Sequence, residues 1–280
     1  MGPQRNQWVV RPGRPEDHAV FSRLFLELGV DDPPPPESVW AGEFARHSLF
    51  AEAADGVGAY AVAEPMGDLG YVGQLVVAPA ARGQGLGRRM MTHVAEHLRA
   101  QGCTRWTLNV KRDNVPALAL YTSLGMQRVR EAATLRVTRE QVAALPSSPT
   151  EVSVVSLLLE DCAALTAAFG MMPGKLERFA TRASHQLLGL VDAGMPSRPW
   201  LGMMDLRASG PVLFPFFAKS PAHARTLLED AFLRVGDGVS SMNVVVTDDA
   251  LLARLLREAG AETRLETLEL RGPLPPAAAR

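Results

Sequence analysis

Cysteine and surplus charge are both scarce in this sequence. Its 280 residues include two cysteines, Cys103 and Cys162, which are too few for the disulfide framework of a small secreted domain and form no metal-binding pattern. Each lies beside or within an apolar segment, so we interpret both as small buried side chains. The 29 basic and 30 acidic residues leave a net charge of −1. That balance excludes a general attraction to nucleic acid or anionic lipid, although it allows a local basic patch.

Long hydrophobic runs are also missing. No apolar run reaches the ~18 residues that a membrane-spanning helix needs, and the polar residues 1–7 do not resemble a signal peptide. We therefore expect a cytoplasmic protein with no membrane partner, and the richness in Ala, Arg, Pro and Gly suggests a GC-rich bacterial genome. Hydrophobic residues make up 47% of the chain and charged residues 21%, which is typical of a globular protein. The length suits two domains.

The first half alternates short apolar strands with amphipathic helices. After a strand at 8–11, a helix begins at Pro15 with acidic residues beside it and ends at Gly29, and the four prolines that follow form a stiff loop. Three strands then read as an antiparallel meander. The elements predicted after the loop are a helix at 37–46, strands at 48–53, 58–64 and 71–77, a helix at 86–101, a strand at 106–110, a helix at 115–124 and a strand at 126–137.

The segment Pro146-Ser147-Ser148-Pro149 has the composition of a linker. We therefore predict a domain at 1–145, a linker at 146–150 and a domain at 151–280. The second domain repeats the element order of the first, which indicates a diverged internal repeat. Its predicted strands are 151–159, 186–192, 200–207, 212–217, 241–246 and 263–270, and its predicted helices are 162–170, 175–184, 221–235 and 248–259.

A glycine-rich turn joins the strand that ends at Val77 to the long helix of the first half. In Arg82-Gly83-Gln84-Gly85-Leu86-Gly87, the glycines let backbone N–H groups approach a ligand closely. The helix N-terminus adds partial positive charge, and Arg82, Arg88 and Arg89 add full charges. The turn therefore predicts a phosphate or pyrophosphate site, and we favour this interpretation over a turn that serves packing alone.

Two other phosphate-binding loops do not fit this turn. The sequence lacks the G-x-x-x-x-G-K-[ST] loop of nucleoside triphosphate enzymes. The dinucleotide pattern G-x-G-x-x-G needs a third glycine, but Arg88 occupies that place after Gly83 and Gly85, and Met90 occupies it after Gly85 and Gly87. The antiparallel meander before the turn also argues against a doubly wound parallel sheet.

The spaced motifs of the first half resemble one family. Arg82-x-x-Gly85-x-Gly87 resembles the [QR]-x-x-G-x-[GA] motif of the GNAT superfamily of N-acetyltransferases. Asn114-x-x-Ala117-x-x-Leu120-Tyr121 is similar to the N-x-x-A-x-x-[LF]-Y helix of that family, and Leu124-Gly125-Met126 is similar to its L-G-F turn, with Met126 in place of the aromatic residue. Arg11-Pro12 with Pro15-Glu16-Asp17 resembles its first strand and helix. The resemblance covers residues 8–137 in the right order.

The resemblance implies a fold and a co-substrate. The fold is α/β with mixed sheets, in two tandem GNAT-like domains, each a mostly antiparallel sheet flanked by helices with a splayed central strand pair. The co-substrate is acetyl-CoA, whose pantetheine arm would pair with the first splayed strand and whose pyrophosphate would lie on the N–H groups of residues 83–88. The implied cofactor-binding residues are Leu75, Val76, Val77, Arg82, Gly83, Gln84, Gly85, Leu86, Gly87, Arg88, Asn114 and Tyr121.

The resemblance also implies a reaction in which a primary amine attacks the acetyl carbonyl directly. The backbone N–H of Val77 would stabilise the oxyanion, and Tyr121 would act as general acid towards the departing thiolate, so these two are the predicted catalytic residues. The general base stays open among Glu52, Glu64, Asp68 and Asp113.

The acceptor and any metal are weakly indicated. Asp31 and Asp32 could attract a cationic amine, or they could serve only as turn residues. His93 and His97 match the H-x-x-E-H spacing of a zinc site, but no third ligand is evident, so we expect no metal. The acceptor is expected to be a small-molecule or peptide amine, and the oligomeric state is not indicated.

The second domain lacks the features that predict cofactor binding. The turn between its strand at 212–217 and its helix at 221–235 contains no glycine, and the helix at 248–259 contains no tyrosine. We therefore expect a degenerate copy that walls the acceptor pocket, docks a partner or stabilises the first domain. Our main hypothesis is an acetyl-CoA-dependent N-acetyltransferase. The alternative is a non-catalytic acyl-CoA-binding or interaction module, which would show neither thioester hydrolysis nor transfer.

Overall fold

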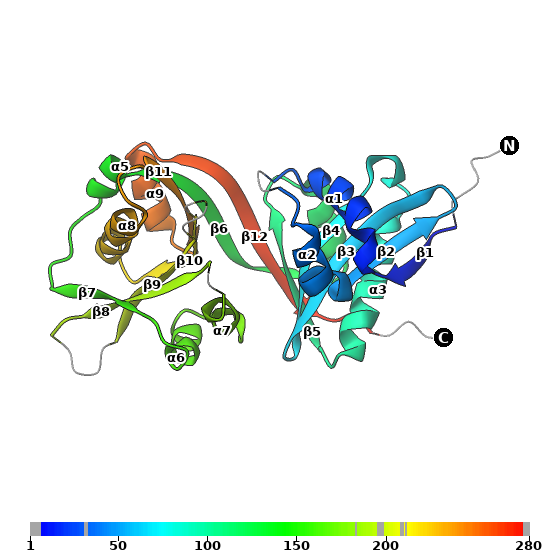
Figure 1. Ribbon diagram of the computed structural model, residues 1–280, viewed down its shortest axis with the longest axis horizontal. Coiled ribbons are helices and arrows are strands. Elements are labelled where there is room, and N and C mark those ends of the chain that lie inside the picture. Colours follow the sequence, from blue (N-terminus) through cyan, green and yellow to red (C-terminus); the bar gives the residue numbers. More distant parts are fainter. Residues whose placement is uncertain are drawn as a thin grey trace. The chain divides into compact units, whose positions relative to one another are not determined.

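The computed structural model describes residues 7–30, 33–182, 184–194, 199–207, 210 and 212–276. Asp31 and Asp32, which the sequence offered as amine-attracting side chains, lie outside the described residues. The chain forms two compact units, whose elements can be followed in Figure 1. The first unit contains the chain up to Val129 together with the segment that begins at Glu269, and the second is Arg130–Leu268.

Two long strands pass from one unit into the other. They are β6 (Gln127–Thr138) and β12 (Glu262–Pro273). In the second unit, β6 pairs with β11 (Ser241–Thr247) in antiparallel register. In the first unit, the hydroxyl of Thr107 donates to the carbonyl of Leu270 on β12 at 3.0 Å. The two halves of the chain therefore exchange their last strands.

This exchange makes the units differ from the predicted domains 1–145 and 151–280. The predicted linker 146–150 lies inside the second unit, and the end of the chain lies in the first. Local sequence patterns identify strands but not their neighbours, because the same apolar face can pair with either copy of a repeated sheet. The boundary at 146–150 therefore stays a prediction.

The first unit is built on a sheet with the strand order β1-β2-β3-β4-β5-β12. Strands β1 to β4 are antiparallel neighbours, whereas β5 runs parallel to β4. The predicted meander is confirmed, as is the strand after the long helix. The strands that precede β12 in this order are β1 (Val9–Pro12), β2 (Ser48–Ala53), β3 (Gly56–Met66), β4 (Leu69–Val77) and β5 (Arg105–Lys111).

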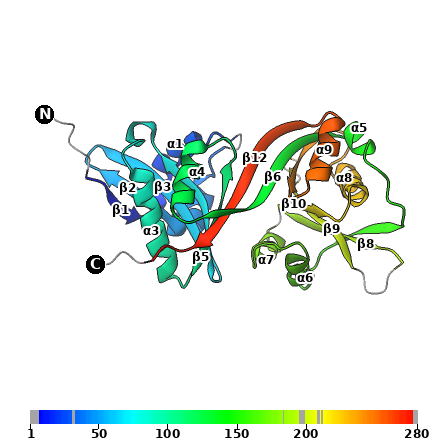
Figure 2. The same cartoon turned by 180° about the vertical axis from the view of Figure 1, so that it is seen from behind.

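Helices cover both faces of this sheet, as Figures 1 and 2 show from opposite sides. One face carries α1 (His18–Phe25), flanked by single 3-10 turns, and α2 (Glu37–Val39), which continues as a π-helical turn at Trp40–Phe44. The other face carries α3 (Leu86–Ala100) and α4 (Val115–Ser123). All four predicted helices of the first half are confirmed.

Packing differs between the two faces. On the α1 side, Phe21 stacks on Trp40 with ring centroids 4.3 Å apart and meets Tyr60 edge-on at 5.2 Å, and all three side chains are fully buried. Such pairs contribute about 0.5–1.5 kcal/mol beyond the area they bury. On the α3 side, a Cβ at Gly70 would lie 2.4 Å from Leu98 Cδ1. Glycine at this position is therefore what lets α3 lie so close to β4.

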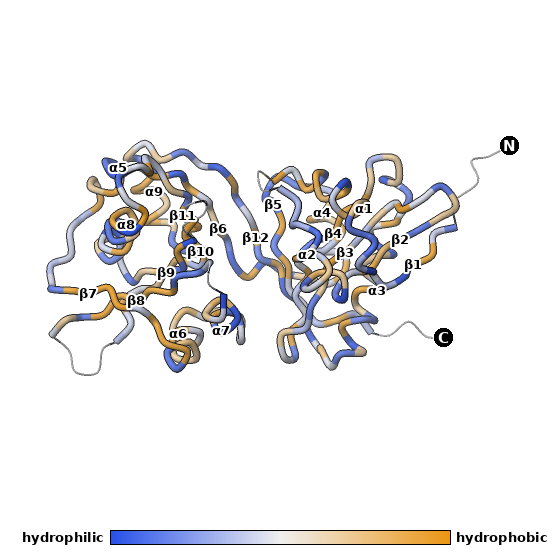
Figure 3. The backbone as a smooth tube through the Cα atoms, in the orientation of Figure 1, coloured by the Kyte–Doolittle hydropathy of each residue, from blue (hydrophilic) through white to orange (hydrophobic). Residues whose placement is uncertain are grey.

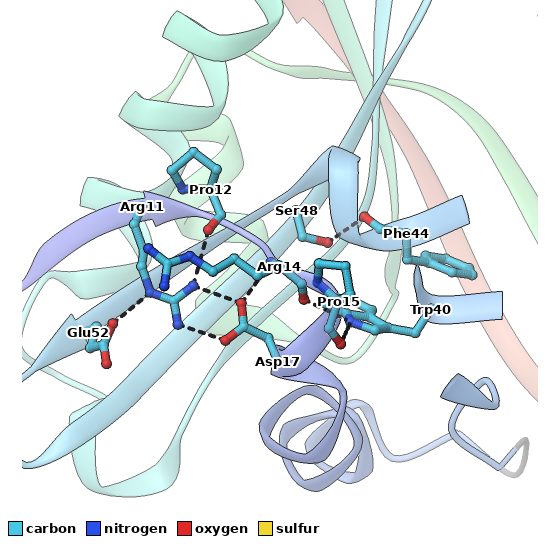
Figure 4. A network of polar contacts seen from close by, with 9 residues as sticks. All are labelled: Arg11, Pro12, Arg14, Pro15, Asp17, Trp40, Phe44, Ser48 and Glu52. Atoms are coloured by element: carbon cyan, nitrogen blue, oxygen red, sulfur yellow. Dashed lines mark hydrogen bonds and ion pairs between the residues drawn. The ribbon is translucent and has the colours of Figure 1, made fainter. Parts of the chain in front are cut away.

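A polar network holds β1 against the first helix (Figure 4). The Arg11 guanidinium binds both carboxylate oxygens of Asp17, at 2.7 and 2.8 Å, and its Nε donates to Glu52 Oε2 at 2.6 Å. Burial alone would raise the pKa of Asp17, but the hydrogen bonds from Arg11 and from the Arg14 N–H outweigh it and lower the pKa. Trp40 Nε1 donates to the Arg14 carbonyl at 3.1 Å. The network joins β1, β2 and the first two helices.

The second unit repeats the architecture of the first. Its strand order, β6-β11-β10-β9-β8-β7, matches β12-β5-β4-β3-β2-β1 in the first unit, and its β10–β11 pair is parallel like β4–β5. The predicted internal repeat and the mixed α/β fold are confirmed. Its remaining elements are α5 (Arg139–Ala143), β7 (Val152–Ser156), α6 (Asp161–Ala168), α7 (Lys175–Ala180), β8 (Gln186–Asp192), β9 (Trp200–Arg207), β10 (Val212–Ala218), α8 (Pro221–Val235) and α9 (Ala250–Glu258).

Hydrophobic residues recur along the strands of each unit, as the hydropathy colouring in Figure 3 shows. Both cysteines are buried and unpaired, which confirms their interpretation as small core side chains. Within the described ranges, none of the helices has the length and apolar character needed to cross a membrane.

A buried carboxylate on β9 is expected to stabilise the second unit. Asp205 is fully buried, and its Oδ2 lies 2.5 Å from His185 Nδ1. Asp205→Ala is expected to lower the free energy of unfolding by about 3–5 kcal/mol, because it leaves a buried imidazole without its partner. Urea denaturation followed by circular dichroism measures this effect. Glu258→Ala removes an exposed carboxylate paired with Arg254 and should change the free energy by less than about 1 kcal/mol; an equal loss in both variants would contradict the expectation.

Candidate functional site

The two parallel strands β4 and β5 separate halfway along their length. Their pairing ends at Val72 opposite Leu108, although β4 continues to Val77. A bulge in β4 at this point shifts its register with β3. Gly73 and Asn109 are exposed although each lies on a strand with neighbours on both sides. The predicted splay of the central pair is confirmed, and it leaves an opening between the strands, which we call the splay opening.

Backbone groups of β4 face the splay opening in alternation. The N–H of Ala78 donates to the Gly58 carbonyl of β3 at 2.8 Å. Because the two sides of an extended strand alternate, the N–H groups of Leu75 and Val77 face away from β3, towards the opening. Val76 directs its backbone groups to β3, and its side chain lies in the buried cluster beneath α1. Of the three residues predicted to bind the cofactor's arm, Leu75 and Val77 therefore offer donors there, and Val76 does not.

The glycine-rich turn opens the N-terminus of α3 to solvent. Gly83 and Gly85 have φ of +75° and +78°, a region that favours glycine. Residues 82–85 are all exposed. The Arg89 N–H bonds to the Gly85 carbonyl at 3.1 Å, and the N–H groups that precede it in the first turn lack intrahelical partners. These N–H groups and the positive end of the helix dipole together can bind an anion.

The side chains of Arg82 and Arg88 bind neighbouring elements and so fix the position of the turn. Arg82 Nε donates to the Val77 carbonyl at 3.0 Å, and its Nη2 binds Glu27 at 2.8 Å. Arg88 Nη2 donates to Ser123 Oγ at 2.7 Å. Arg82 therefore links the turn to the end of β4 and to the first helix, and Arg88 links α3 to α4. The sequence predicted these arginines as anion ligands, and their contacts leave that role mainly to the backbone.

Helix α4 packs against the end of β4 and the start of α3. A Cβ at Gly87 would lie 3.4 Å from Leu120 Cδ2 and 3.7 Å from Val77 Cγ2, so the end of β4, the start of α3 and the middle of α4 meet there. The next residue, Tyr121, is buried, and burial raises the pKa of its hydroxyl to about 12. Tyr121 is therefore protonated at neutral pH and can donate a hydrogen bond.

Asn114 has a structural task that the sequence did not predict. It is the N-cap of α4, and its Oδ1 accepts a hydrogen bond from the Ala117 N–H at 3.2 Å. Such a cap contributes about 1 kcal/mol to helix stability. Any contact with a cofactor is left to the amide nitrogen of the same side chain, which is exposed.

The four candidate bases lie in different surroundings. Glu52 is bound to Arg11, and Asp68 is bound to Arg105 at 2.9 Å, so both carboxylates are already used in ion pairs. Asp113 is exposed in the loop before α4. Glu64 lies directly opposite Tyr71 in the β3–β4 pair, at the bulge beside the splay opening. Of the four, Glu64 is the one that the fold brings to the region where β4 and β5 separate.

The equivalent turn of the second unit is built differently. Helix α8 is capped by Ser220, whose Oγ accepts from the His223 N–H at 3.2 Å, and Pro221 at its first position has no N–H. The orphan donors that form an anion site at α3 are thus reduced or used at α8. This arrangement agrees with the interpretation of the second half as a degenerate copy.

The histidine pair on α3 is held by neighbours on its own helix. His93 Nδ1 lies 3.4 Å from Glu96, and His97 Nε2 lies 2.6 Å from the Gln101 amide. In the part of the chain that the structure describes, no three His, Cys, Asp or Glu side chains converge on one point.

Comparisons with known proteins find similarity to acetyltransferases. Residues 18–126 match the family model described as "Acetyltransferase (GNAT) family". Mycothiol acetyltransferase of Saccharomonospora viridis is 40% identical over 65 residues, which are 23% of this chain and 20% of that protein. [Ribosomal protein bS18]-alanine N-acetyltransferase of Salmonella typhimurium is 32% identical over 78 residues, 28% of this chain and 53% of that protein. The matches thus span between a fifth and about half of these relatives.

Solved structures are similar over the whole chain. A GCN5-related N-acetyltransferase from Sphaerobacter thermophilus superposes with a TM-score of 0.67 at 20% identity, covering 100% of this chain and 99% of that one. A tandem GNAT protein from the clavulanic acid biosynthesis pathway superposes with a TM-score of 0.60 at 15% identity, covering 96% and 99%. At this level of identity the likeness extends to the fold, including the arrangement of two repeats in one chain.

Proposed function

Because residues 18–126 match the model of the GNAT acetyltransferase family, we propose that the protein transfers an acetyl group from acetyl-CoA to a primary amine. The observation that carries this proposal is the convergence of three elements at the splay opening. The end of β4 offers the Leu75 and Val77 N–H groups, the start of α3 offers free backbone donors, and α4 offers the Tyr121 hydroxyl. We assign these groups to the acyl carbonyl, the pyrophosphate and the departing thiolate in that order.

Acetyl-CoA fits the groups that line this path. A Cβ added at Gly83 or Gly85 would meet no atom within 4 Å, so the space in front of the helix N-terminus is open to a pyrophosphate. The unpaired side of β4 offers alternate N–H and C=O groups, and an extended ligand arm can pair with them as an added strand. The chain would then hold the thioester between the Leu75 and Val77 donors and the Tyr121 hydroxyl.

The chemistry needs donors more than it needs a strong acid. When an amine attacks the thioester carbonyl, negative charge develops on oxygen, and N–H groups fixed in advance stabilise it. Tyr121, with a pKa of about 12, is a weaker acid than a thiol with a pKa near ~8.5, so complete proton transfer to the thiolate costs roughly 5 kcal/mol. We therefore assign Tyr121 the role of a hydrogen-bond donor to the departing sulfur.

Tyr121→Phe is expected to lower kcat by about 10- to 100-fold, because it removes one hydrogen bond to a developing charge. The dissociation constant of acetyl-CoA should change little, since the donors at β4 and α3 remain. Steady-state assays of thiol release measure kcat, and calorimetry measures the affinity. Tyr60→Phe is the matched control, because that hydroxyl bonds to Gln74 in the core beneath α1. A Tyr121→Phe variant with wild-type turnover would remove the residue from the mechanism.

The proposed acceptor is an amine, with no choice between a small molecule and a peptide. One of the relatives is named for mycothiol and the other for the alanine of a ribosomal protein, so the comparisons favour neither a small molecule nor a peptide. The proposal is tested by following thiol release from acetyl-CoA with a panel of both kinds of amine. Binding of acetyl-CoA without hydrolysis or transfer to any of them would instead support a non-catalytic acyl-CoA-binding module.

A further inference from the structure

Polar side chains gather on one face of the sheet beside the splay opening. Tyr71 on β4 lies opposite Glu64 on β3 and opposite Thr107 on β5, so the three side chains share a face. The preceding residue, Gly70, faces Leu98 of α3. Since side chains alternate along a strand, Tyr71 lies on the face away from α3. This group is therefore separate from the anion site at the start of α3.

Tyr71 reaches along β4 towards the bulge. A Cβ at Gly73 would lie 3.4 Å from Tyr71 Cε1, so the ring of Tyr71 lies across this glycine. Its hydroxyl hydrogen-bonds with the side chain of Asn109 on β5, a residue that is exposed. The hydroxyl is thereby held at the splay opening, near the stretch of β4 that presents the Leu75 N–H.

The last strand of the chain supplies a carboxylate to this place. The Glu269 side chain is only 13% exposed. Its Oε1 accepts hydrogen bonds from Thr107 Oγ1 at 3.1 Å and from Arg271 Nη2 at 2.7 Å. Its Oε2 has no hydrogen-bond partner within the described ranges of the chain. Oε2 is not one of the fully buried atoms that lack a partner, so solvent reaches it, and a ligand can donate a hydrogen bond to it.

Negative charge acts on the Tyr71 hydroxyl. Burial has the largest effect on the pKa of Tyr71 and raises it, and the charges of Glu64 and Glu269 raise it further, while the contact with Asn109 lowers it. Both carboxylates therefore lie close enough to influence an ionising group at the hydroxyl. A cation at the same point would be stabilised by the same charges.

We propose that Tyr71, Asn109 and Glu269 form an acceptor subsite that binds the ammonium form of the substrate amine, and that Glu269 Oε2 accepts its proton. This inference rests on the proposed acetyl transfer. The ammonium gives one proton to Oε2, and the free amine attacks the thioester carbonyl carbon. The C–N bond forms, the C–S bond breaks, and the second amine proton passes to the departing sulfur. Glu269 then releases its proton to water.

The acceptor subsite gives the second half of the chain a role in the reaction of the first half. Glu269 lies on β12, the strand that the second half contributes to the first unit, and is the residue at which that unit resumes. The phosphate-binding turn is lost from the second copy, but its last strand supplies a reacting group. Loss of cofactor binding in that copy therefore does not make it dispensable.

Glu269→Gln in the full chain tests this proposal. The amide oxygen can still accept from Thr107 and Arg271, so a purely structural role is preserved, whereas the charge and the proton acceptor are removed. We expect kcat/KM for primary alkylamines to fall by about 100-fold with an unchanged dissociation constant for acetyl-CoA. Glu269→Asp keeps the carboxylate and should recover at least tenfold of this loss. Glu262→Gln makes the same change on the same strand, at a carboxylate paired with Arg264, and should leave kcat/KM within about twofold of wild type.

The possible results distinguish failure of the acceptor subsite from failure of the proposed acetyl transfer. If the wild-type protein transfers acetyl groups to amines but Glu269→Gln stays within about threefold of it, the acceptor subsite is wrong and the acetyltransferase stands. If Gln and Asp lose activity equally, together with acetyl-CoA affinity, Glu269 only stabilises the sheet and the subsite is again wrong. If the wild-type protein binds no acetyl-CoA or acetylates no amine, the proposed function fails and the subsite fails with it.

Discussion

Gly85→Glu is expected to abolish acetyl-CoA binding. The residue has φ of +78° and caps α3, and a side chain there would extend into open space in front of the helix N-terminus. A carboxylate in that space would occupy the pyrophosphate position and repel it. Two unit charges about 4 Å apart at an effective dielectric constant of about 20 interact by about 4 kcal/mol, which is roughly a 1000-fold loss of affinity. Isothermal titration calorimetry measures this loss directly.

The control for this variant lies at the other end of the same helix. Gly102 has φ of +85°, and a Cβ there would also meet no atom within 4 Å. Gly102→Glu therefore carries the same left-handed backbone cost of about 1–2 kcal/mol and the same charge, but away from the predicted phosphate position. It should bind acetyl-CoA as the wild type does. Retained affinity in Gly85→Glu, at equal thermal stability of the two variants, would overturn the placement of the phosphate site.

A fragment of residues 1–145 is expected neither to fold nor to bind acetyl-CoA. It lacks the end of β12, which neighbours β5 in the first unit. There the Leu274 N–H donates to the Thr104 carbonyl at 2.9 Å, Thr107 donates to the Leu270 carbonyl at 3.0 Å, and the Leu270 side chain is buried. Without this strand, β5 would be an unprotected sheet edge beside an exposed apolar surface, which favours aggregation. Circular dichroism and calorimetry of the purified fragment test this expectation.

Cleavage of the full chain provides the matched comparison. A protease site introduced at 146–150 would separate a piece that contains β6 from a piece that contains β12, while leaving every strand in place. Because β6 pairs within the second unit and the end of β12 lies in the first, the cleaved pieces should stay associated and keep their affinity for acetyl-CoA. Pieces that separate under native conditions, or a 1–145 fragment that binds normally, would contradict the exchange of strands.

Local structure could be predicted closely from the sequence. The bounds of β2, β8, β9 and α8 agree with the predicted ranges, because apolar periodicity and turn residues are local signals. The exchange of last strands could not be predicted. The two sheets have similar apolar patterns, so each last strand could pair with the edge of either sheet. The contacts of Arg82 could not be predicted for a related reason. Its charge is visible in the sequence, but its contacts with Val77 and Glu27 depend on the fold.

The open glycine-rich turn before α3 could be predicted from the sequence, and the grouping of residues in the proposed acceptor subsite could not. Gly83, Gly85 and the helix that follows are contiguous, so one short segment of sequence predicts an open helix N-terminus. Tyr71, Asn109 and Glu269 lie on three strands, and Glu269 is 160 residues or more from either partner in the sequence. Strand alternation alone would place Tyr71 and Glu64 on one face only if the register, including the bulge at Gly73, were already known.

The most direct test of the account is the stoichiometry of acetyl-CoA binding to the full-length wild-type protein, measured by isothermal titration calorimetry. One site per chain is predicted, since the first unit has an open helix N-terminus beside a splayed strand pair and the second unit has a helix start capped by Ser220. Two sites per chain would contradict the interpretation of the second half as a copy without cofactor binding. No binding would contradict the proposed function itself.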